Sequence, residues 1–342
     1  MNRDLKLKIT FINVGNGDSI LVECPGEKGC FTMLIDGGSG EEDEYRDSIT
    51  GRIRAADFME LTGVKHLDVM VNTHIHEDHT CGLLPVARKW VPRQFWQPYS
   101  LSLAGREVPD DFPDAEKEST RKFLEALQDY HRLCIMIKEQ GGSICQMGGN
   151  ELQLCPCSGL RVKLLGPGIS AVRERMEYFD RFYCEEGTER LHMAEWLDAH
   201  INNSSIIMML ECGGRKILLP GDTDYAGYGG AGQSLKADIF KVGHHGQQNG
   251  LDKKLLHAAS PEYAVICASS DRRYGSADPK LLELAVSDGA KLMFTDCPEV
   301  PTYTDGLSAH LGIRFEIFSD GSMTAAYIPK YECPVMRGSH KM

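Results

Sequence analysis

The stretch Thr73–His79, which reads Thr-His-Ile-His-Glu-Asp-His, follows a short apolar run that has the length of a buried strand. Three imidazoles and a carboxylate therefore leave the end of one strand together. Titratable groups crowded in this way repel or desolvate one another unless a cation shares their lone pairs. Imidazole and carboxylate are ligands of zinc and related divalent metals. We therefore expect His74 and His76 to bind one ion, and Asp78 and His79 to bind a second.

Carboxylates and imidazoles recur at the ends of other predicted strands. Three further apolar runs end in such residues: Asp36 after 30–35, Asp222 after 215–219, and His244 with His245 after 237–242. Two glycines follow Asp36, so it either forms a simple turn or orients a metal-bound histidine from behind. The sequence thus predicts that the polar ends of several strands meet at one edge.

The composition describes an acidic chain with ample material for a core. The 342 residues carry a formal net charge of −12, and 42% of them are apolar. An acidic surface disfavours loose, charge-driven binding to nucleic acid or anionic lipid. No segment approaches the ~20 apolar residues of a membrane span, and the start of the chain lacks a signal-peptide core. The 12 cysteines are scattered, which favours reduced thiols and a cytoplasmic location.

Strand patterns come in two blocks, each with helical patterns interleaved. This order predicts an α/β (α+β) fold in which two mixed sheets lie face to face with helices outside. We expect a single domain over residues 1–330, with a mainly helical insertion at about 100–200 and an irregular tail at 331–342. In the insertion, Tyr178 and Trp196 are expected either to pack or to contact substrate.

The motifs His-x-His-x-Asp-His at 74–79, Gly-Asp at 221–222 and His-His-Gly at 244–246 resemble those of the metallo-β-lactamase superfamily. A finer likeness is to the soluble domain of the ComEC-type DNA-uptake channels and their free-standing relatives. It is carried by the segments 14–19, 35–38, 202–205, 219–222 and 241–246. The resemblance implies an αβ/βα sandwich with a two-metal site at the sheet edges. This chain departs from the channels in having no membrane-spanning pattern.

Carried over to this chain, the resemblance assigns His74 and His76 to the first ion and Asp78 and His79 to the second. It also makes Asp222 a bridge between the two ions.

Three positions are less firmly assigned by the resemblance. Adjacent residues that leave a strand point to opposite sides, so we expect His245 to complete the second site and His244 to face the substrate. The superfamily usually takes another histidine for the first ion. His200 lies near that place in the sequence, and Asn203 is the alternative occupant.

These assignments imply a binuclear metal-dependent hydrolase with two divalent ions, zinc or manganese. A metal-bridging hydroxide would attack the substrate while His244 stabilises the developing charge and Asp78 guides the proton. The resemblance favours a phosphodiesterase or nuclease. Because no cluster of Arg or Lys accompanies the motifs, a phosphodiester small molecule competes with a short nucleic acid as substrate. The alternatives are a thioester, lactone or lactam hydrolase on the same fold, and a metal-binding sensor or partner protein without activity.

Overall fold

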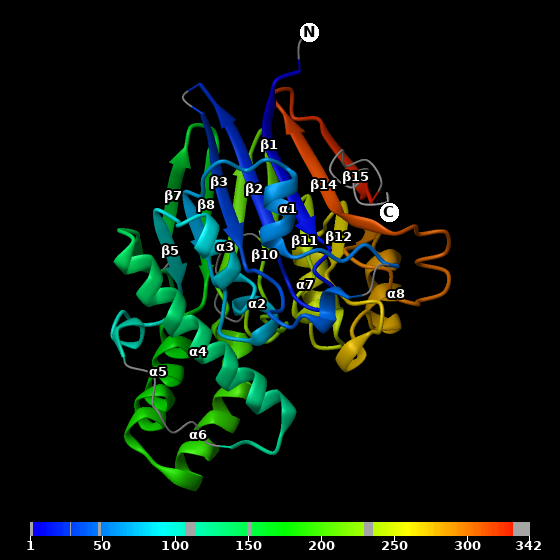
Figure 1. Ribbon diagram of the computed structural model, residues 1–342. Coiled ribbons are helices and arrows are strands. Elements are labelled where there is room, and N and C mark those ends of the chain that lie inside the picture. The colour runs from blue at the N-terminus through cyan, green and yellow to red at the C-terminus, as the bar shows by residue number, and fades with distance from the viewer. Residues whose placement is uncertain are drawn as a thin grey trace, which may run out of the picture.

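The computed structural model describes residues 3–27, 29–46, 49–106, 114–148, 152–228 and 235–330, which form two β-sheets with helices outside (Figure 1). The first sheet has the order β15-β14-β1-β2-β3-β4-β5-β6 and the second the order β13-β12-β11-β10-β9-β8-β7. Both sheets mix parallel and antiparallel pairs. This architecture confirms the predicted α/β sandwich.

The strands of the first sheet are β1 (Leu5–Ile12), β2 (Ile20–Gly26), β3 (Gly29–Ile35), β4 (Val69–Val71), β5 (Gln94–Gln97), β6 (Ser143–Gln146), β14 (His310–Phe318) and β15 (Met323–Pro329). Those of the second sheet are β7 (Leu152–Cys157), β8 (Leu160–Gly166), β9 (Ile207–Cys212), β10 (Arg215–Leu219), β11 (Ile239–Lys241), β12 (Tyr263–Ile266) and β13 (Lys291–Phe294).

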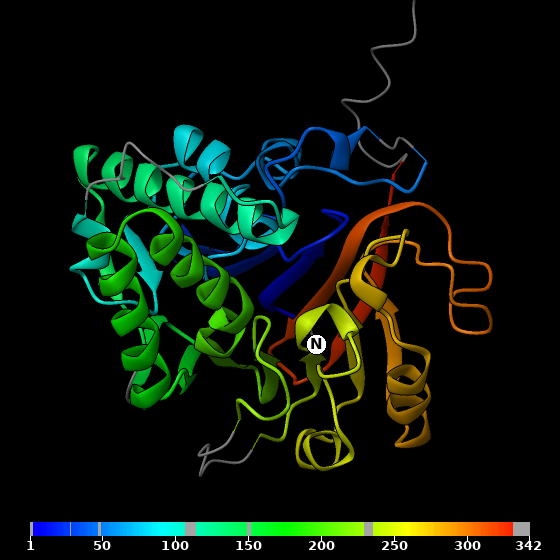
Figure 2. The ribbon, with the colours of Figure 1, turned by 90° about the horizontal axis from the view of Figure 1, so that it is seen from below.

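The α-helices are α1 (Ala55–Leu61), α2 (Glu77–Thr80), α3 (Leu83–Lys89), α4 (Glu118–Glu139), α5 (Ile169–Cys184), α6 (Gly187–His200), α7 (Lys253–Ala259) and α8 (Pro279–Ser287). Short 3₁₀ turns are η1 (Asp43–Tyr45), η2 (Leu103–Gly105), η3 (Ile201–Ser204), η4 (His244–Gly246) and η5 (Arg273–Gly275). Seen from below, α5 and α6 lie to one side of the strand ends and α8 to the other (Figure 2).

The parallel pairing of the strands determines at which edge of each sheet the polar residues after the strands lie. Strands β3 to β6 pair in parallel in the first sheet, and β10 to β13 do so in the second. The carboxyl ends of parallel neighbours lie at the same edge of a sheet. The residues that follow β3, β4, β10 and β11 therefore emerge near one another, at the lower edge in Figure 1 where α2 lies.

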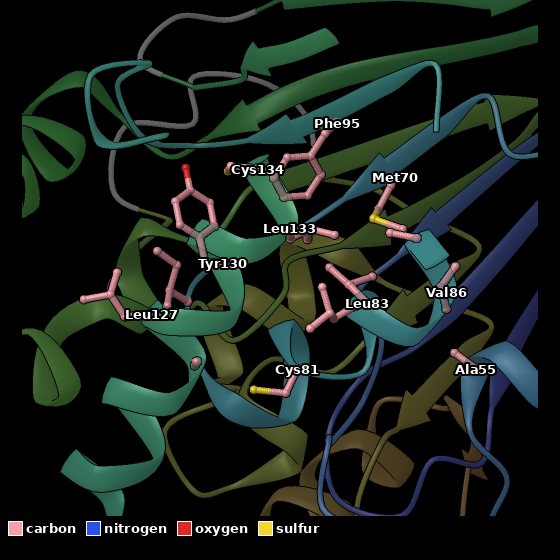
Figure 3. Close-up of a cluster of buried hydrophobic side chains, with 14 of the residues drawn as sticks. Ala55, Met70, Cys81, Leu83, Val86, Phe95, Leu127, Tyr130, Leu133 and Cys134 are labelled. Carbon is pink, nitrogen blue, oxygen red and sulfur yellow. The ribbon is translucent and has the colours of Figure 1, made fainter. Parts of the chain in front are cut away.

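Three apolar layers hold this arrangement. Alternate residues of β1, namely Leu7, Ile9 and Phe11, point into the layer between the sheets, where they join residues of the second sheet such as Leu210. A second layer lies under α1 and α3 to α6, and a third lies under α7 and α8. Figure 3 shows Met70 and Phe95 beside the side chains of α3 and α4. Each such fully buried side chain contributes roughly 1.5–3 kcal/mol.

Residues 100–200 are helical in α4, α5 and α6, and they also contain strands. Strand β6 extends the first sheet, and β7 and β8 extend the second. The helical part packs on the outer face of the first sheet through residues such as Phe123, Tyr130 and Phe179. The domain limits stay a prediction, and the predicted tail at 331–342 lies outside the described residues. None of the described helices combines the length and the apolar character needed to cross a membrane.

Candidate metal centre

Two histidine side chains face each other across the two sheets at the polar edge. His79 from α2 and His245 from the turn after β11 bring their Nε2 atoms to 3.3 Å. The Asp222 Oδ2 atom lies 2.9 Å from His245 Nε2 and 3.3 Å from His79 Nε2. Asp78 Oδ2 lies 3.2 Å from His245 Nε2. All four ligand-type side chains therefore converge on one small volume.

The other nitrogen of each facing imidazole already has an acceptor. Asp36 Oδ2 lies 2.9 Å from His79 Nδ1, and the Cys267 carbonyl lies 3.0 Å from His245 Nδ1. Acceptors in these places hold the proton on Nδ1 and leave a lone pair on Nε2. Both Nε2 atoms can therefore face one divalent cation, which would take the place of the protons that Asp222 otherwise attracts to them. The donor set fits a metal ion.

Asp36 is held in place by the backbone of the ligand loop. Thr73 donates to it twice, from the amide to Oδ1 at 2.8 Å and from the hydroxyl to Oδ2 at 2.6 Å. The carboxylate therefore lies behind His79 and fixes the orientation of its ring.

A second pair of histidines lies beside the first. His74 Nε2 lies 3.1 Å from His76 Nδ1, while His74 Nδ1 is next to the hydroxyl of Ser205 at 3.2 Å. His76 Nε2 in turn lies 3.1 Å from the carbonyl oxygen of Asp198 on α6. The ligand atoms of His74, His79 and Asp222 also lie within 4.8 Å of one another. Asp222 therefore stands between the two pairs, where a bridging ligand is expected.

Electrostatics in this cluster follow from burial and close charges. Burial lowers the pKa of His79 and His245, but the carboxylates around them, Asp222 foremost, raise both pKa values well above the ordinary one. Burial raises the pKa of Asp222, yet His245, His79 and Lys241 hold it well below its usual range. The carboxylates therefore favour protons on His79 and His245, and metal binding to these two imidazoles would displace those protons. For His74, burial holds the pKa well below its ordinary value, which suits a neutral ligand.

The paired histidines leave β11 in a left-handed turn, not in an extended one. His244 and His245 have φ values of 48° and 52°. Non-glycine residues adopt this region at an energetic cost, and such residues cluster at functional sites. The turn sends His245 into the ligand cluster and His244 to the wall of a cavity. There His244 Nδ1 lies 2.9 Å from Asn249 Oδ1, and its Nε2 lies 3.2 Å from Asn202 Nδ2.

Two residues predicted near the first ion are not brought to the centre. His200 is exposed at the end of α6, where its Nδ1 lies 2.7 Å from the Trp196 carbonyl and its ring stacks on the Trp196 ring. Asn203 exchanges hydrogen bonds with Asp224. The reason is the 3₁₀ turn η3, which follows α6 and turns Asn202 toward His244 in place of Asn203.

Sequence reasoning missed two charged residues of the site, Asp18 and Lys241. Lys241 is fully buried, and its Nζ lies 2.5 Å from Asp18 Oδ2 and 3.2 Å from Asp222 Oδ1. It therefore holds one oxygen of Asp222 and leaves Oδ2 for the histidine side. The available signal was a lysine at the end of an apolar strand, since lysine is almost never fully buried without a partner.

Asp18 was hidden in a segment that reads as a hairpin turn. Residues 13–19 form a longer loop in which the Asp18 amide donates to the Asp78 carbonyl at 3.2 Å. At Gly17, with a φ of +110°, a Cβ atom would lie 2.0 Å from that same carbonyl oxygen. The glycine is therefore required for the close approach of the two ligand loops.

A cavity of about 270 Å³ opens over the cluster. Its walls include Asp78, Asp222, His244 and His245 on one side, and Lys117, Lys122 and Phe123 of the α4 region on the other. Tyr178 and Trp196 do not belong to this wall, and they stack on each other at a ring-centroid distance of 3.4 Å. Tyr178 and Trp196 thus pack against each other, whereas Phe123, which belongs to the core under α4, also borders the cavity.

Comparisons with known proteins agree with this geometry. A family model described as the metallo-β-lactamase superfamily matches residues 12–135. ComE operon protein 3 of Bacillus subtilis (strain 168) is 25% identical over 300 residues, covering 84% of this chain and 32% of that protein. Competence protein ComA of Neisseria gonorrhoeae is 30% identical over 112 residues, covering 32% of this chain and 16% of that protein. The chain thus spans about a third or less of the length of these relatives.

Among solved structures, the metallo-β-lactamase FIM-1 from Pseudomonas aeruginosa in its mono-zinc form is 12% identical, with a TM-score of 0.29. That match covers 84% of this chain and 94% of the other. The sequence matches and the ligand-type residues gathered at the strand ends support a metallo-β-lactamase superfamily protein related to the ComEC-type proteins.

Proposed function

We propose that this protein is a phosphodiesterase or nuclease that works with two divalent ions, zinc or manganese. The observation that carries the proposal is the pair of facing Nε2 atoms of His79 and His245, with Asp222 Oδ2 within 3.3 Å of both. Two buried imidazoles that share one carboxylate at this distance form a typical set of ligands for a divalent metal ion. Metal binding is therefore the role that best explains the arrangement. The second histidine pair, His74 and His76, offers a place for the other ion.

The ligand atoms can be assigned from their free lone pairs. One ion would take His74 Nε2 and His76 Nδ1, and the other would take His79 Nε2, His245 Nε2 and Asp78, with Asp222 between them. When bound, two such ions lower the pKa of a water and neutralise charge on the attacked group.

Two side chains at the cavity wall can handle protons. Asp78 Oδ2 accepts a hydrogen bond from Asn16 Nδ2 at 2.7 Å, which orients its carboxylate. Burial lowers the pKa of His244 below its ordinary value, so its imidazole is neutral near pH 7. Asn249 Oδ1 holds the proton of Nδ1, and this leaves Nε2 as an acceptor. His244 would therefore take up a proton during the reaction and return it to the leaving oxygen.

An anionic substrate is favoured by the far wall of the cavity. Lys117 and Lys122 line it, although both are paired with carboxylates, Lys117 with Asp198 at 3.1 Å and Lys122 with Glu41 at 3.1 Å. Both ammonium groups already line the cavity, so a phosphate that binds there can interact with them without the burial of a further charged side chain. The wall therefore suits a phosphodiester small molecule or a short nucleic acid better than a neutral lactam. Every cysteine among the described residues is a free thiol, which supports a cytoplasmic location.

Metal analysis followed by turnover of bis-p-nitrophenyl phosphate tests the proposal. We expect about two ions per chain and metal-dependent release of p-nitrophenolate, both lost in Asp222→Asn. Asp57→Asn is the matched control, because Asp57 is an exposed carboxylate on α1. Hydrolysis of a thioester or lactone but not of the phosphodiester would assign the alternative chemistry. Failure to bind any divalent metal would overturn the proposal.

A further inference from the structure

A second, larger cavity adjoins the one over the metal centre. It has a volume of about 930 Å³ and shares two wall residues, Gln247 and Tyr274, with the cavity over the ligands. A substrate anchored at the metal centre can therefore extend into this second cavity past Tyr274. Asn249 lines it too, and the same side chain holds Nδ1 of His244.

Two tyrosine rings are unusually exposed in this second cavity. Tyr274 is 64% exposed and Tyr225 is 46% exposed, and both belong to its wall. Between them the wall presents the carboxamides of Gln247, Gln248 and Asn249. Aromatic faces combined with amide donors and acceptors match a flat heteroaromatic ring that stacks and also forms hydrogen bonds at its edge.

The loop that carries Tyr274 is held rigidly against the metal centre. Ala277 and Asp278 donate backbone hydrogen bonds to the carbonyls of His245 and Gly246, at 3.3 and 2.9 Å. Beside Tyr274, Arg273 Nη1 lies 2.6 Å from Oε2 of the buried Glu44. Because these contacts fix the backbone of the loop, only the side chain of Tyr274 has to be ordered when a ligand stacks on its ring.

The charges of the two cavities differ. Among the described residues, the second cavity is lined by the charged residues Asp252, Asp278 and Lys280, and the cavity at the metal centre by Lys117, Lys122 and four carboxylates that include Asp78 and Asp222. Bound metal ions would therefore attract a phosphate to the metal centre, whereas the second cavity, with no metal ligands of its own, favours an uncharged group. An aliphatic chain there would offer no hydrogen-bond partner to the carboxamides of Gln247 and Gln248, whereas Asn249 Oδ1 is already paired with His244 Nδ1.

We propose that the second cavity binds the base of a nucleotide-type phosphodiester whose phosphate lies at the metal centre. This inference rests on the proposed function and names its substrate class. Tyr274 stacks on the base at the junction of the two cavities, Tyr225 contributes a second aromatic face, and the carboxamides bind the edge of the ring. Tyr274 is accordingly a specificity residue, and it takes no part in the chemical step.

A pair of chromogenic esters isolates the contribution of the base. The p-nitrophenyl ester of thymidine monophosphate carries a base, and methyl p-nitrophenyl phosphate has the same leaving group without one. We expect the ratio of their kcat/KM values to fall roughly 5- to 100-fold in Tyr274→Ala, the range for losing one base–aromatic stack. Tyr274→Phe should keep the ratio, and Tyr225→Ala should lower it less. Ile135→Ala, which removes an exposed side chain of α4 away from both cavities, should leave both values unchanged.

The outcomes separate this inference from the proposed function. A merely structural role of Tyr274 would lower both kcat/KM values together and leave their ratio unchanged, which would overturn the subsite. If neither ester is hydrolysed by the wild-type protein, the phosphodiesterase proposal fails. Calorimetric binding of thymidine monophosphate and of deoxyribose phosphate to the metal-loaded protein then decides the subsite. Tighter binding of the nucleotide that is lost in Tyr274→Ala supports it, and equal binding of the two compounds overturns it.

Discussion

The metal centre and the helical insertion both bury polar side chains, but the two regions satisfy them differently. In the insertion, the Asp198 carboxylate accepts hydrogen bonds from Ser119 at 2.7 Å, Thr120 at 3.1 Å and Lys117 at 3.1 Å. At the metal centre, His79 and His245 present nitrogen to nitrogen. The Asp198 carboxylate has one donor for each of its hydrogen bonds, whereas the two imidazoles crowd around shared carboxylates and offer a cation several ligand atoms at once.

The largest expected effect comes from removing the carboxylate between the two histidine pairs. Asp222→Ala should weaken both metal sites and lower turnover by more than about 10³-fold, because Asp222 lies close to ligand atoms of both histidine pairs. Elemental analysis and phosphodiester hydrolysis measure the two effects. In Asp198→Ala, by contrast, metal should remain, while stability falls by about 1–3 kcal/mol because three donors lose their acceptor. If Asp222→Ala still bound two ions, Asp222 would be no more important for metal binding than Asp198 of the insertion, and the proposed difference between the two regions would be wrong.

The paired histidines sharpen the comparison within the metal centre itself. His245→Ala should lose an ion, because its Nε2 atom lies among the ligand atoms. His244→Ala should keep its ions and lose about 10²–10³-fold in kcat, as expected for a group that acts on the reacting atoms. Metal content and kcat measured on the same samples decide between the roles. Equal metal loss in both variants would show that His244 is also a ligand.

Removing metal should loosen one region and spare the other. At a metal concentration of 100 to 1,000 times Kd, binding adds about 3–4 kcal/mol to the free energy of unfolding. A chelator should therefore lower the unfolding temperature. It should also speed amide hydrogen exchange around residues 73–80 and 243–246 more than in the middle of α4. Uniform protection across the chain with and without chelator would contradict a site that is completed by its ligand.

The smallest effect is expected from a buried histidine of the insertion that needs no metal. Burial, with a smaller contribution from Arg106, lowers the pKa of His131 to about 4. In the unfolded chain its pKa is about 6.5, so between these values only the unfolded state binds the proton. Its contribution to stability is complete above pH 6.5 and is lost as the pH falls toward 4, by about 3 kcal/mol. Denaturant titrations at several pH values should show that the free energy of unfolding falls more steeply with pH in wild type than in His131→Gln between pH 6.5 and pH 4. The metal content of the variant should not change.

The same contrast explains what the sequence reveals. His74, His76, Asp78 and His79 are recognisable because they are neighbours in the chain, and the apolar runs before Asp36, Asp222 and His245 mark strand ends. The two-sheet fold follows from the same runs. The contact between Asp18 and Lys241 forms only when the sheets pack, because the two residues are far apart in the sequence, although the position of Lys241 at the end of an apolar run was a usable signal.

Errors of assignment arose where local geometry decides direction. His200 and Asn203 lie close to the site along the chain, but the end of α6 and the turn η3 point their side chains elsewhere. Strand β6 has only four residues within a largely helical region, so its pattern is too short to recognise. The apolar pattern determines neither the direction of a side chain at a helix end nor the presence of so short a strand.

The long chain separation between facing ligands bears on the order of events in folding. His79 and His245 are 166 residues apart in the sequence, and they follow strands of different sheets, β4 and β11. Closing a loop of that length costs entropy before any ligand pair exists to reward it. An ion therefore cannot gather these residues from an unfolded chain, and it meets a complete site only after the sheets have paired. Metal should accordingly leave the folding rate nearly unchanged and slow unfolding. It would then stabilise the native state after folding and take no part in the folding nucleus.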